Sequence, residues 1–160
     1  MFYLDLFRSL ERHRVRYLLV GGLAMNLHGV PRMTMDVDLA LALDSANLQG
    51  FFDAVRELGL KPALPVLLED LCDAGKRAEW VEKRNMIAFA LQGAEKNVPT
   101  VDVLIGVELP FEQAYCRRET RDLAGVPVSL ASVEDMISLK EQAGRAQDIS
   151  DIRHLKSGRP

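Results

Sequence analysis

The sequence predicts an α+β fold, and three observations lead to this class. The chain has 160 residues, of which 48% are hydrophobic and 27% charged, and this composition and length suit one globular domain with its own core. Segments with apolar residues at helical spacing alternate with short apolar segments of strand length. Glycines and prolines stop many of these segments. We therefore expect a single domain over residues 1–160, with residues 132–156 as a C-terminal helical appendix.

The first half of the chain is expected to alternate helices and strands. Apolar residues recur on one side of each amphipathic segment, and the strands are short and apolar. In order, the predicted elements are a helix over 2–14, a strand over 17–22, a helix over 23–29, a strand over 35–43 and a helix over 46–59.

The second half is less regular, and residues 62–84 stay unassigned because prolines and a glycine interrupt a partly helical pattern. Ser132 is expected to cap a helix with Asp135 at its third position, a variant of the capping box. The predicted elements are strands over 86–91 and 100–106, a helix over 110–117, a strand or hairpin over 121–132, and helices over 133–143 and 145–156.

Charge, cysteine content and hydropathy narrow the class of protein. The net charge of −3 gives no general attraction to nucleic acid or to an anionic membrane. Cys72 and Cys116 lie far apart without zinc-type spacing, so we expect free thiols, buried or half-buried, in an intracellular protein. The N-terminus does not have the pattern of a signal peptide, and no apolar stretch is long enough to span a membrane. A cytoplasmic protein is therefore expected.

Two aspartates interrupt the apolar strand predicted over 35–43. Asp36 and Asp38 alternate with Val37, so both carboxylates project from one face of the strand. Their repulsion and lost hydration are tolerable if a divalent cation such as Mg²⁺ binds between them. Asp102, within another apolar strand, is a third candidate ligand if the two strands are neighbours. The alternative is that the pair caps turns or lies on a solvated strand edge.

A glycine pair, Gly21 and Gly22, joins the first predicted strand to the following helix. Such a junction lets the backbone approach a ligand closely and directs free amides toward a phosphate. Taken alone, a glycine pair favours an ordinary tight turn. Neither a Walker loop nor a GxGxxG pattern is present.

Together these residues resemble the hG[GS]…DxD…D signature of the nucleotidyltransferase superfamily typified by DNA polymerase beta. The strings "GGLAMNLHGVPRMTMDVDL" and "LKEQAGRAQDISDI" are similar to the small bacterial nucleotidyltransferases of the AbiEii toxin type. In those proteins an Arg-x-Thr element precedes the DxD and a Lys…Arg…Asp pattern lies near the C-terminus. The resemblance implies a mixed β-sheet flanked by helices, a nucleoside triphosphate substrate, and Mg²⁺ or Mn²⁺ as cofactor.

The resemblance also implies roles for individual residues. Asp36 and Asp38 match the metal-binding pair of the family. Asp102 matches the third carboxylate, which is a metal ligand and helps to activate the acceptor nucleophile. Gly21 and Gly22 match the turn that binds phosphate. These three carboxylates form the expected catalytic centre.

Further residues are candidates for nucleotide binding. Arg32 and Thr34 lie just before the DxD, and Thr34 has the strand parity of Asp36, so its hydroxyl is placed to reach substrate. Lys140 and Arg145 are candidates for triphosphate contacts, with Asp148 orienting one of them. The alternatives are a surface arginine beside a β-branched strand residue, and surface ion pairs of little energetic value.

Other polar residues favour structural roles. His28 is a possible general base, but a packing or hydrogen-bonding role fits better beside Gly29. Trp80, Lys83 and Arg84 could stack on and hold an RNA end, although a solvated helix face is the simpler interpretation.

Three functions are consistent with this pattern. The first is transfer of a nucleoside monophosphate to a tRNA end or a protein hydroxyl, by the toxin of a toxin–antitoxin pair, so that an antitoxin is a possible partner. The second is modification of an antibiotic, and the third is a non-catalytic nucleotide-binding module. The three carboxylates argue against the third. The sequence leaves open the acceptor, the preferred nucleotide and the oligomeric state.

Overall fold

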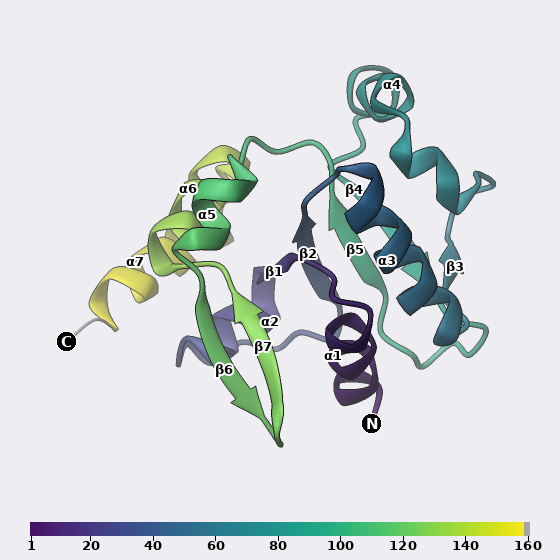
Figure 1. The fold of residues 1–160 in the computed structure, drawn as a ribbon. Helices are drawn as coiled ribbons and strands as arrows, with labels where there is room; N and C mark the ends of the chain where they lie inside the picture. Colours follow the sequence, from purple (N-terminus) through teal and green to yellow (C-terminus); the bar gives the residue numbers. More distant parts are fainter. Residues whose placement is uncertain (159–160) are drawn as a thin grey trace.

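The computed structural model describes residues 1–158, whose strands form one mixed seven-stranded sheet (Figure 1). The strands are β1 (Tyr17–Val20), β2 (Val37–Leu41), β3 (Lys61–Pro62), β4 (Ala88–Gln92), β5 (Val101–Leu104), β6 (Glu119–Leu123) and β7 (Val126–Leu130). Their order is β3-β4-β5-β2-β1-β7-β6. The β1–β7 and β2–β5 pairs are parallel and the others antiparallel. The predicted α+β class with a mixed sheet and C-terminal helices is confirmed.

The helices gather in two groups around this sheet. They are α1 (Phe2–Arg12), α2 (Gly21–Leu27), α3 (Ser45–Glu57), the 3₁₀ helix η1 (Leu68–Cys72), α4 (Ala74–Arg84), α5 (Phe111–Cys116), α6 (Val133–Ala143) and α7 (Ala146–Ser157). In Figure 1, α5, α6 and α7 lie together on the left, and α3, η1 and α4 lie on the right. Helices α6 and α7 pack on each other, as do α1 and α3.

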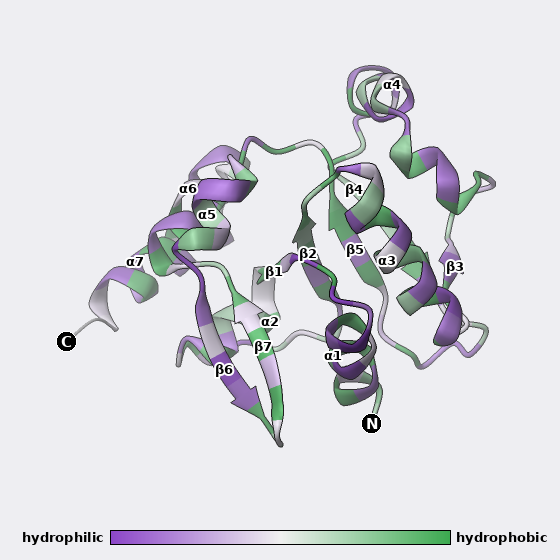
Figure 2. Cartoon of the chain, in the orientation of Figure 1, coloured by the Kyte–Doolittle hydropathy of each residue, from purple (hydrophilic) through white to green (hydrophobic). Residues whose placement is uncertain are grey.

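The core lies between the sheet and the amphipathic helices α1 and α3. Helix α1 buries Leu6, Phe7 and Leu10 completely, at the spacing of one helical face. The start of β2 alternates between core and site: Val37 and Leu39 are fully buried, whereas the side chains between and before them are aspartates. Figure 2 shows mixed hydrophobic and hydrophilic residues along α3 and a mainly hydrophilic β6, the edge strand. Charged residues on an edge strand disfavour pairing with another chain.

The predicted cap of α6 is confirmed. The Ser132 side chain accepts a hydrogen bond from the backbone N–H of Asp135 at 3.1 Å. Gly144 ends the helix in the left-handed region, with φ of +64°, and the chain turns directly into α7. This tight junction keeps α7 packed against α6.

Residues 62–84 contain η1 and α4, which the interrupted pattern did not resolve. Asp73 caps α4 by accepting from the N–H of Lys76 at 3.1 Å. Trp80 is 6% exposed and packs on Phe89 with ring centroids 5.4 Å apart. Trp80 therefore belongs to the core, so it neither stacks on an RNA end nor lies on a solvated face, whereas Lys83 and Arg84 are exposed as the solvated-face interpretation expects.

Several boundaries also differ from those expected. Helix α2 begins at Gly21, two residues early, and β2 begins only at Val37, so Asp36 precedes the strand. The strand or hairpin expected over 121–132 is the β6–β7 hairpin, which runs from Glu119 to Leu130 and has Ala124 and Gly125 at positive φ in its turn. Cys116 is exposed rather than buried, while Cys72 is half-buried, and both are free thiols. In the described part of the chain, no helix has the length and hydrophobicity needed to cross a lipid bilayer.

Candidate active site

Asp38 and Asp102 lie side by side at the centre of the sheet. Strands β2 and β5 are parallel neighbours, and their register pairs Asp38 with Asp102. Both side chains are half-buried, whereas the flanking Val37 and Val101 are fully buried on the opposite face. Because side chains alternate along a strand, the two carboxyls share the face that the core does not occupy.

Asp36 lies beside this pair, at the entrance to β2. Its side chain is exposed, and Oδ1 accepts a hydrogen bond from the backbone N–H of Thr100 at 3.2 Å. Thr100 directly precedes β5, so this contact ties the approaches of the two central strands together. The charge of Asp36 acts on both Asp38 and Asp102. The structure thus brings the three predicted carboxylates together.

The electrostatics of the three acids reflect crowding and burial. Burial raises the pKa of Asp38 to about 6, and the charges of Asp102 and Asp36 add to this shift. Lys140 and Arg32 oppose it by smaller amounts. Burial and then the charge of Asp36 also raise the pKa of Asp102, against a hydrogen bond with Asp38 that lowers it. The ionised cluster is therefore unfavourable without a compensating cation.

The donor set has the chemistry of a site for a hard divalent ion. Mg²⁺ and Mn²⁺ prefer carboxylate oxygens and retain some water, so three aspartates are a sufficient protein contribution. Within residues 1–158, however, no three His, Cys, Asp or Glu side chains already form a metal site. The three aspartates therefore fit a divalent ion by ligand type, charge and proximity.

The glycine pair packs tightly against two of the residues flagged in the sequence. A Cβ added at Gly21 would lie 2.1 Å from Oδ2 of Asp38, and one added at Gly22 would lie 2.8 Å from Cβ of Thr34. Gly21 also has φ of +72°, a conformation that side chains rarely adopt. The strand-to-helix turn therefore requires glycine because the Asp38 carboxyl and the Thr34 side chain occupy the adjacent space.

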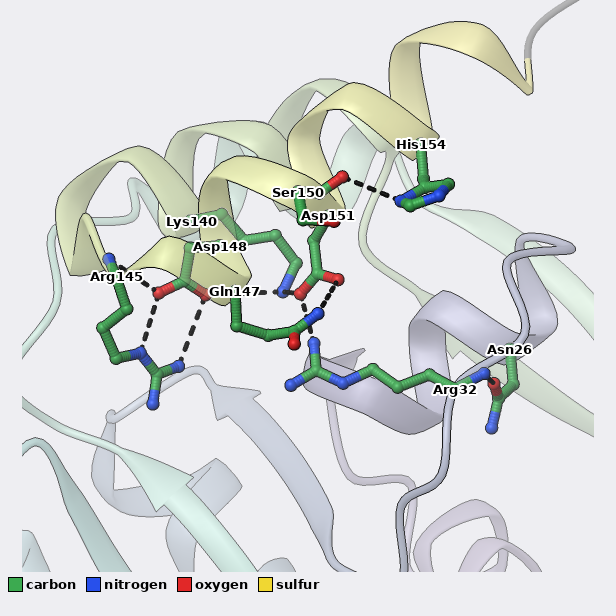
Figure 3. Close-up of polar contacts among 9 residues, drawn as sticks. All are labelled: Asn26, Arg32, Lys140, Arg145, Gln147, Asp148, Ser150, Asp151 and His154. Atoms are coloured by element: carbon green, nitrogen blue, oxygen red, sulfur yellow. Dashed lines mark hydrogen bonds and ion pairs between the residues drawn. The ribbon is translucent and has the colours of Figure 1, made fainter.

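Two buried aspartates of α7 bind the basic residues predicted to contact nucleotide (Figure 3). Asp151 is 2% exposed and accepts from Nζ of Lys140 at 2.8 Å and from Gln147 at 3.0 Å, and it also pairs with Arg32. Asp148 is 1% exposed and accepts from Nε of Arg145 at 2.8 Å. Asp148 and Asp151 are three residues apart and so share one face of the helix.

This network joins the C-terminal helices to the loop before β2. Arg32 reaches Asp151 from that loop while its backbone N–H donates to Asn26 of α2 at 2.8 Å. Burial acts to raise the pKa of Asp151, but the hydrogen bonds from Lys140 and Gln147 together with the charges of Lys140 and Arg32 lower it below the usual value. The side chain of Lys140 is only 9% exposed. The pairs of Lys140 and Arg32 with Asp151 are thus buried or half-buried, and the interpretation as surface ion pairs is wrong for them.

A pocket of about 380 Å³ opens between the sheet and α6, next to these groups. Its lining includes Gly21 and the charged side chains of Asp38, Lys140, Arg145 and Asp148. The other lining residues, Val20, Ile87, Ala88, Leu104, Val107, Met136, Leu139 and Ala143, are all apolar. Ligand pockets commonly combine such an apolar body with a few polar groups. Arg32 and Thr34 lie outside this lining.

His28 has the structural role that its sequence context favours. Its side chain is 3% exposed, and Nε2 hydrogen-bonds the carbonyl of Ala131 at 2.8 Å. Ala131 follows β7, so His28 holds α2 against that strand. A buried, hydrogen-bonded imidazole in this position does not serve the carboxylate site.

The comparison with protein families decides the assignment. The model of the nucleotidyl transferase AbiEii toxin, from a type IV toxin–antitoxin system, matches residues 4–159. The chain belongs to the AbiEii nucleotidyltransferase family. The match covers almost the whole chain, including the glycine pair, the DxD and the C-terminal Lys…Arg…Asp segment. The predicted family and the predicted enzyme class, a nucleotidyltransferase, are confirmed.

Solved structures show that this AbiEii family member shares its fold with other nucleotidyltransferases. ANT(2″)-Ia in complex with adenylyl-2″-tobramycin matches with a TM-score of 0.60 and 16% identity, over 97% of this chain and 86% of that chain. The lincomycin-bound lincosamide antibiotic adenylyltransferase LnuA matches with a TM-score of 0.61 and 17% identity, over 98% and 94%. An antigenic nucleotidyltransferase-like protein from Paracoccidioides brasiliensis matches with a TM-score of 0.54 and 23% identity, over 94% and 71%. A search of curated proteins finds no match.

Asp151 is the main polar residue of the site that sequence reasoning missed. Asp148 binds Arg145, as expected of a residue that orients one of the two basic side chains, whereas the contacts to both Lys140 and Arg32 come from Asp151. The signal was present in the sequence, because an aspartate three residues after Asp148 must share its helix face. No comparable pattern in the sequence indicated that Ile87 and Leu139 line the pocket.

Proposed function

We propose that this AbiEii nucleotidyltransferase transfers a nucleoside monophosphate from a nucleoside triphosphate to a macromolecular acceptor, a tRNA end or a protein hydroxyl. The observation that carries the proposal is the register pairing of Asp38 with Asp102, with Asp36 beside them and with Asp38 lining the pocket. The family assignment supports a toxin role with an antitoxin partner, since the family is described as a toxin of a toxin–antitoxin system.

The three carboxylates would hold Mg²⁺ or Mn²⁺. Once bound, the ion neutralises triphosphate charge and stabilises the attacking and leaving oxygens. The crowding that raises the pKa of Asp38 and Asp102 supports this assignment, because a divalent cation removes the repulsion that burial makes costly.

In this proposal the protein residues orient the reactants and accept a proton. The acceptor oxygen forms a bond to the α-phosphorus, and the bond from that phosphorus to the pyrophosphate oxygen breaks. Asp102, next to Asp38 in the register of the two central strands, would take the proton of the acceptor hydroxyl. Lys140 and Arg145, which line the same pocket, are the candidate phosphate contacts. Gly21 lines the same pocket, so its backbone would face the nucleotide, while Gly22 leaves room for the Thr34 side chain.

Modification of a small hydroxylated drug is the second candidate. It is favoured by the antibiotics in the structures of two proteins with the same fold, adenylyl-2″-tobramycin and lincomycin. Those proteins are under 25% identical to this chain, so the likeness concerns the fold. The family match over residues 4–159 makes the macromolecular acceptor the first choice.

A transfer assay separates these candidates. Purified protein is incubated with Mg²⁺, each α-phosphate-labelled nucleoside triphosphate and, in turn, total tRNA, lysate protein, an aminoglycoside and a lincosamide. We expect label in tRNA or protein, and none with Asp38→Asn. Label only in a drug would support the second candidate. Nucleotide binding without transfer to any pool would instead identify a non-catalytic module and contradict the proposal.

A further inference from the structure

The segment from Val30 to Asp36 connects α2 to β2 and contains no helix or strand of its own. Its first half is bonded to α2. The N–H of Val30 donates to the carbonyl of Met25 at 2.9 Å, and the N–H of Arg32 donates to the side chain of Asn26 at 2.8 Å (Figure 3). These bonds fix the start of the segment against the preceding helix.

The second half of the segment, which carries Met35 and Asp36, is held in a different way. The side chain of Met35 is 62% exposed, so burial does not fix this residue. Its backbone carbonyl accepts a hydrogen bond from Oη of Tyr3 at 2.7 Å, across 32 positions of sequence. The first helix of the chain therefore holds the backbone directly before Asp36.

Tyr3 is a firm anchor for this bond, because its ring packs against the hydrophobic core. It lies on α1 one turn before Leu6 and Phe7, and both of these residues are fully buried. The Tyr3 ring also contacts the ring of Phe2 edge to face, with the centroids 6.0 Å apart. The packed ring thus holds the hydroxyl in place at the edge of the core.

A hydrogen bond to the Met35 carbonyl acts directly on the position of Asp36. The peptide bond is planar, so the carbonyl of Met35 and the nitrogen and Cα of Asp36 belong to one rigid unit. On the other side of Asp36, the N–H of Val37 donates to the carbonyl of Thr100 at 2.9 Å. Asp36 is therefore held from both sides, by Tyr3 before it and by Thr100 after it.

We propose that Tyr3 is a positioning residue, which holds Asp36 in place as a metal ligand through the peptide bond that precedes it. This inference rests on the proposed function, which assigns a divalent ion to Asp36, Asp38 and Asp102. Asp36 is the exposed member of this cluster and precedes its strand, so its place depends on individual contacts more than on burial or the sheet. Hydrogen bonds that orient metal ligands from outside the coordination shell contribute about 10- to 100-fold to metal affinity.

Tyr3→Phe tests the bond, because it removes the hydroxyl and keeps the ring in the core. Isothermal titration calorimetry with Mn²⁺ alone measures the affinity of the folded protein for the metal. We expect the affinity to fall by about tenfold, the lower end of the range, since the Tyr3 bond is open to solvent. Hydrogen exchange measured by NMR should also become faster at the Val37 amide, whose bond to Thr100 begins β2.

Tyr17→Phe is the matched control. Its Oη accepts a hydrogen bond from the N–H of Ser129 at 3.2 Å, so this variant also loses a tyrosine hydroxyl that bonds the backbone. Tyr17 begins β1, at the end of the strand away from Gly21, and is buried. Tyr17→Phe should therefore have a lower melting temperature and bind Mn²⁺ as tightly as the parent. Tyr3→Phe should show the reverse pattern.

The outcomes separate this inference from the proposed function. Equal Mn²⁺ affinity of Tyr3→Phe and the parent would overturn the inference, as would an equal loss of affinity in both tyrosine variants. An unchanged exchange rate at Val37 would also overturn it, because the hydroxyl would then not hold the entrance to β2. Failure of the folded parent to bind Mn²⁺ would instead contradict the metal assignment in the proposed function, and exchange at Val37 would still test whether Tyr3 holds Asp36.

Discussion

Gly21 and Asp38 are in direct contact, so that a Cβ at position 21 would lie 2.1 Å from Oδ2 of Asp38. No side chain fits this gap unless the carboxyl or the turn moves. Position 21 also has φ of +72°, which adds backbone strain for any residue other than glycine. The turn and the carboxylate cluster are therefore one packed unit.

Gly21→Ala is expected to destabilise the fold and to abolish transfer. Gly59→Ala is a matched control, because Gly59 has φ of +71° and nothing within 4 Å of an added Cβ. Gly59→Ala should lower the free energy of unfolding by about 1 kcal/mol, from backbone strain alone. Gly21→Ala should lower it by about 2 kcal/mol more, because the added Cβ displaces Asp38. Urea unfolding measures both. Equal losses would contradict the close packing.

Asp38 is expected to make stability fall as the pH rises. The pKa of Asp38 is about 6 in the folded protein and about 3.9 in an unfolded chain. The folded state therefore binds the proton more tightly, an advantage that is complete below pH of about 4 and is lost as the pH rises through about 6. At pH 8 without divalent ions, Asp38→Asn should be more stable than the parent by about 2 kcal/mol, and the difference should vanish near pH 4.

Urea titrations across this pH range measure that difference, and Mg²⁺ supplies the control. The ion should raise the melting temperature of the parent at pH 8 but not that of Asp38→Asn, because a ligand stabilises only the state that binds it. A stability difference that stays constant from pH 4 to pH 8 would contradict the raised pKa.

The common face of Asp36 and Asp38 could be predicted from the sequence because its determinants are local. The alternation of Asp36, Val37 and Asp38 set the face of β2, and Asp102 needed only a neighbouring strand. The β2–β5 pairing is a long-range contact that no local pattern encodes, so the sequence offered it only as a condition, and the family resemblance supplied Asp102 as the third carboxylate. Asp36 lies before the strand rather than within it. There its Oδ1 accepts a hydrogen bond from the N–H of Thr100, a residue 64 positions away in the sequence.

Burial of polar residues was harder to predict than their presence. Trp80 sits on a helix rich in charge, and only its packing on Phe89 of β4 shows it to be a core residue. Lys140 likewise has the composition of a surface residue, and its burial follows from the turn at Gly144 that folds α7 back over it. In both residues, tertiary packing rather than the local sequence pattern determines the burial of the side chain.

The Asp151 network is expected to stabilise the C-terminal helices. Asp151→Ala leaves the buried Lys140 with Asp148 at 3.7 Å as its remaining partner and also releases Arg32. Loss of one member of a buried pair costs about 3 kcal/mol, so unfolding in urea should show a decrease of that order. The lowered pKa of Asp151 means that this contribution is present above the unfolded-state pKa and is lost as the pH falls through the folded value.

Arg145→Met serves as the control for that variant. Its side chain is 72% exposed although it pairs with the buried Asp148, so its removal should cost under about 1 kcal/mol. The two variants should differ clearly at pH 7 and converge in acid. A loss for Asp151→Ala no greater than for Arg145→Met would show that the Lys140 and Arg32 contacts add little stability.

Asp102→Asn should block transfer while leaving nucleotide binding nearly intact. Asp102 is the proposed proton acceptor, and an amide cannot take the proton of the acceptor hydroxyl, so kcat should fall by about 10²- to 10⁴-fold. Asp38, Lys140 and Arg145 still line the pocket, so the dissociation constant of an α,β-methylene triphosphate should change by less than about tenfold, or 1.4 kcal/mol. Calorimetry and single-turnover transfer measure the two quantities separately. Equal losses in binding and in rate would instead make Asp102 chiefly a binding residue, and transfer at the parent rate would remove it from the catalytic centre.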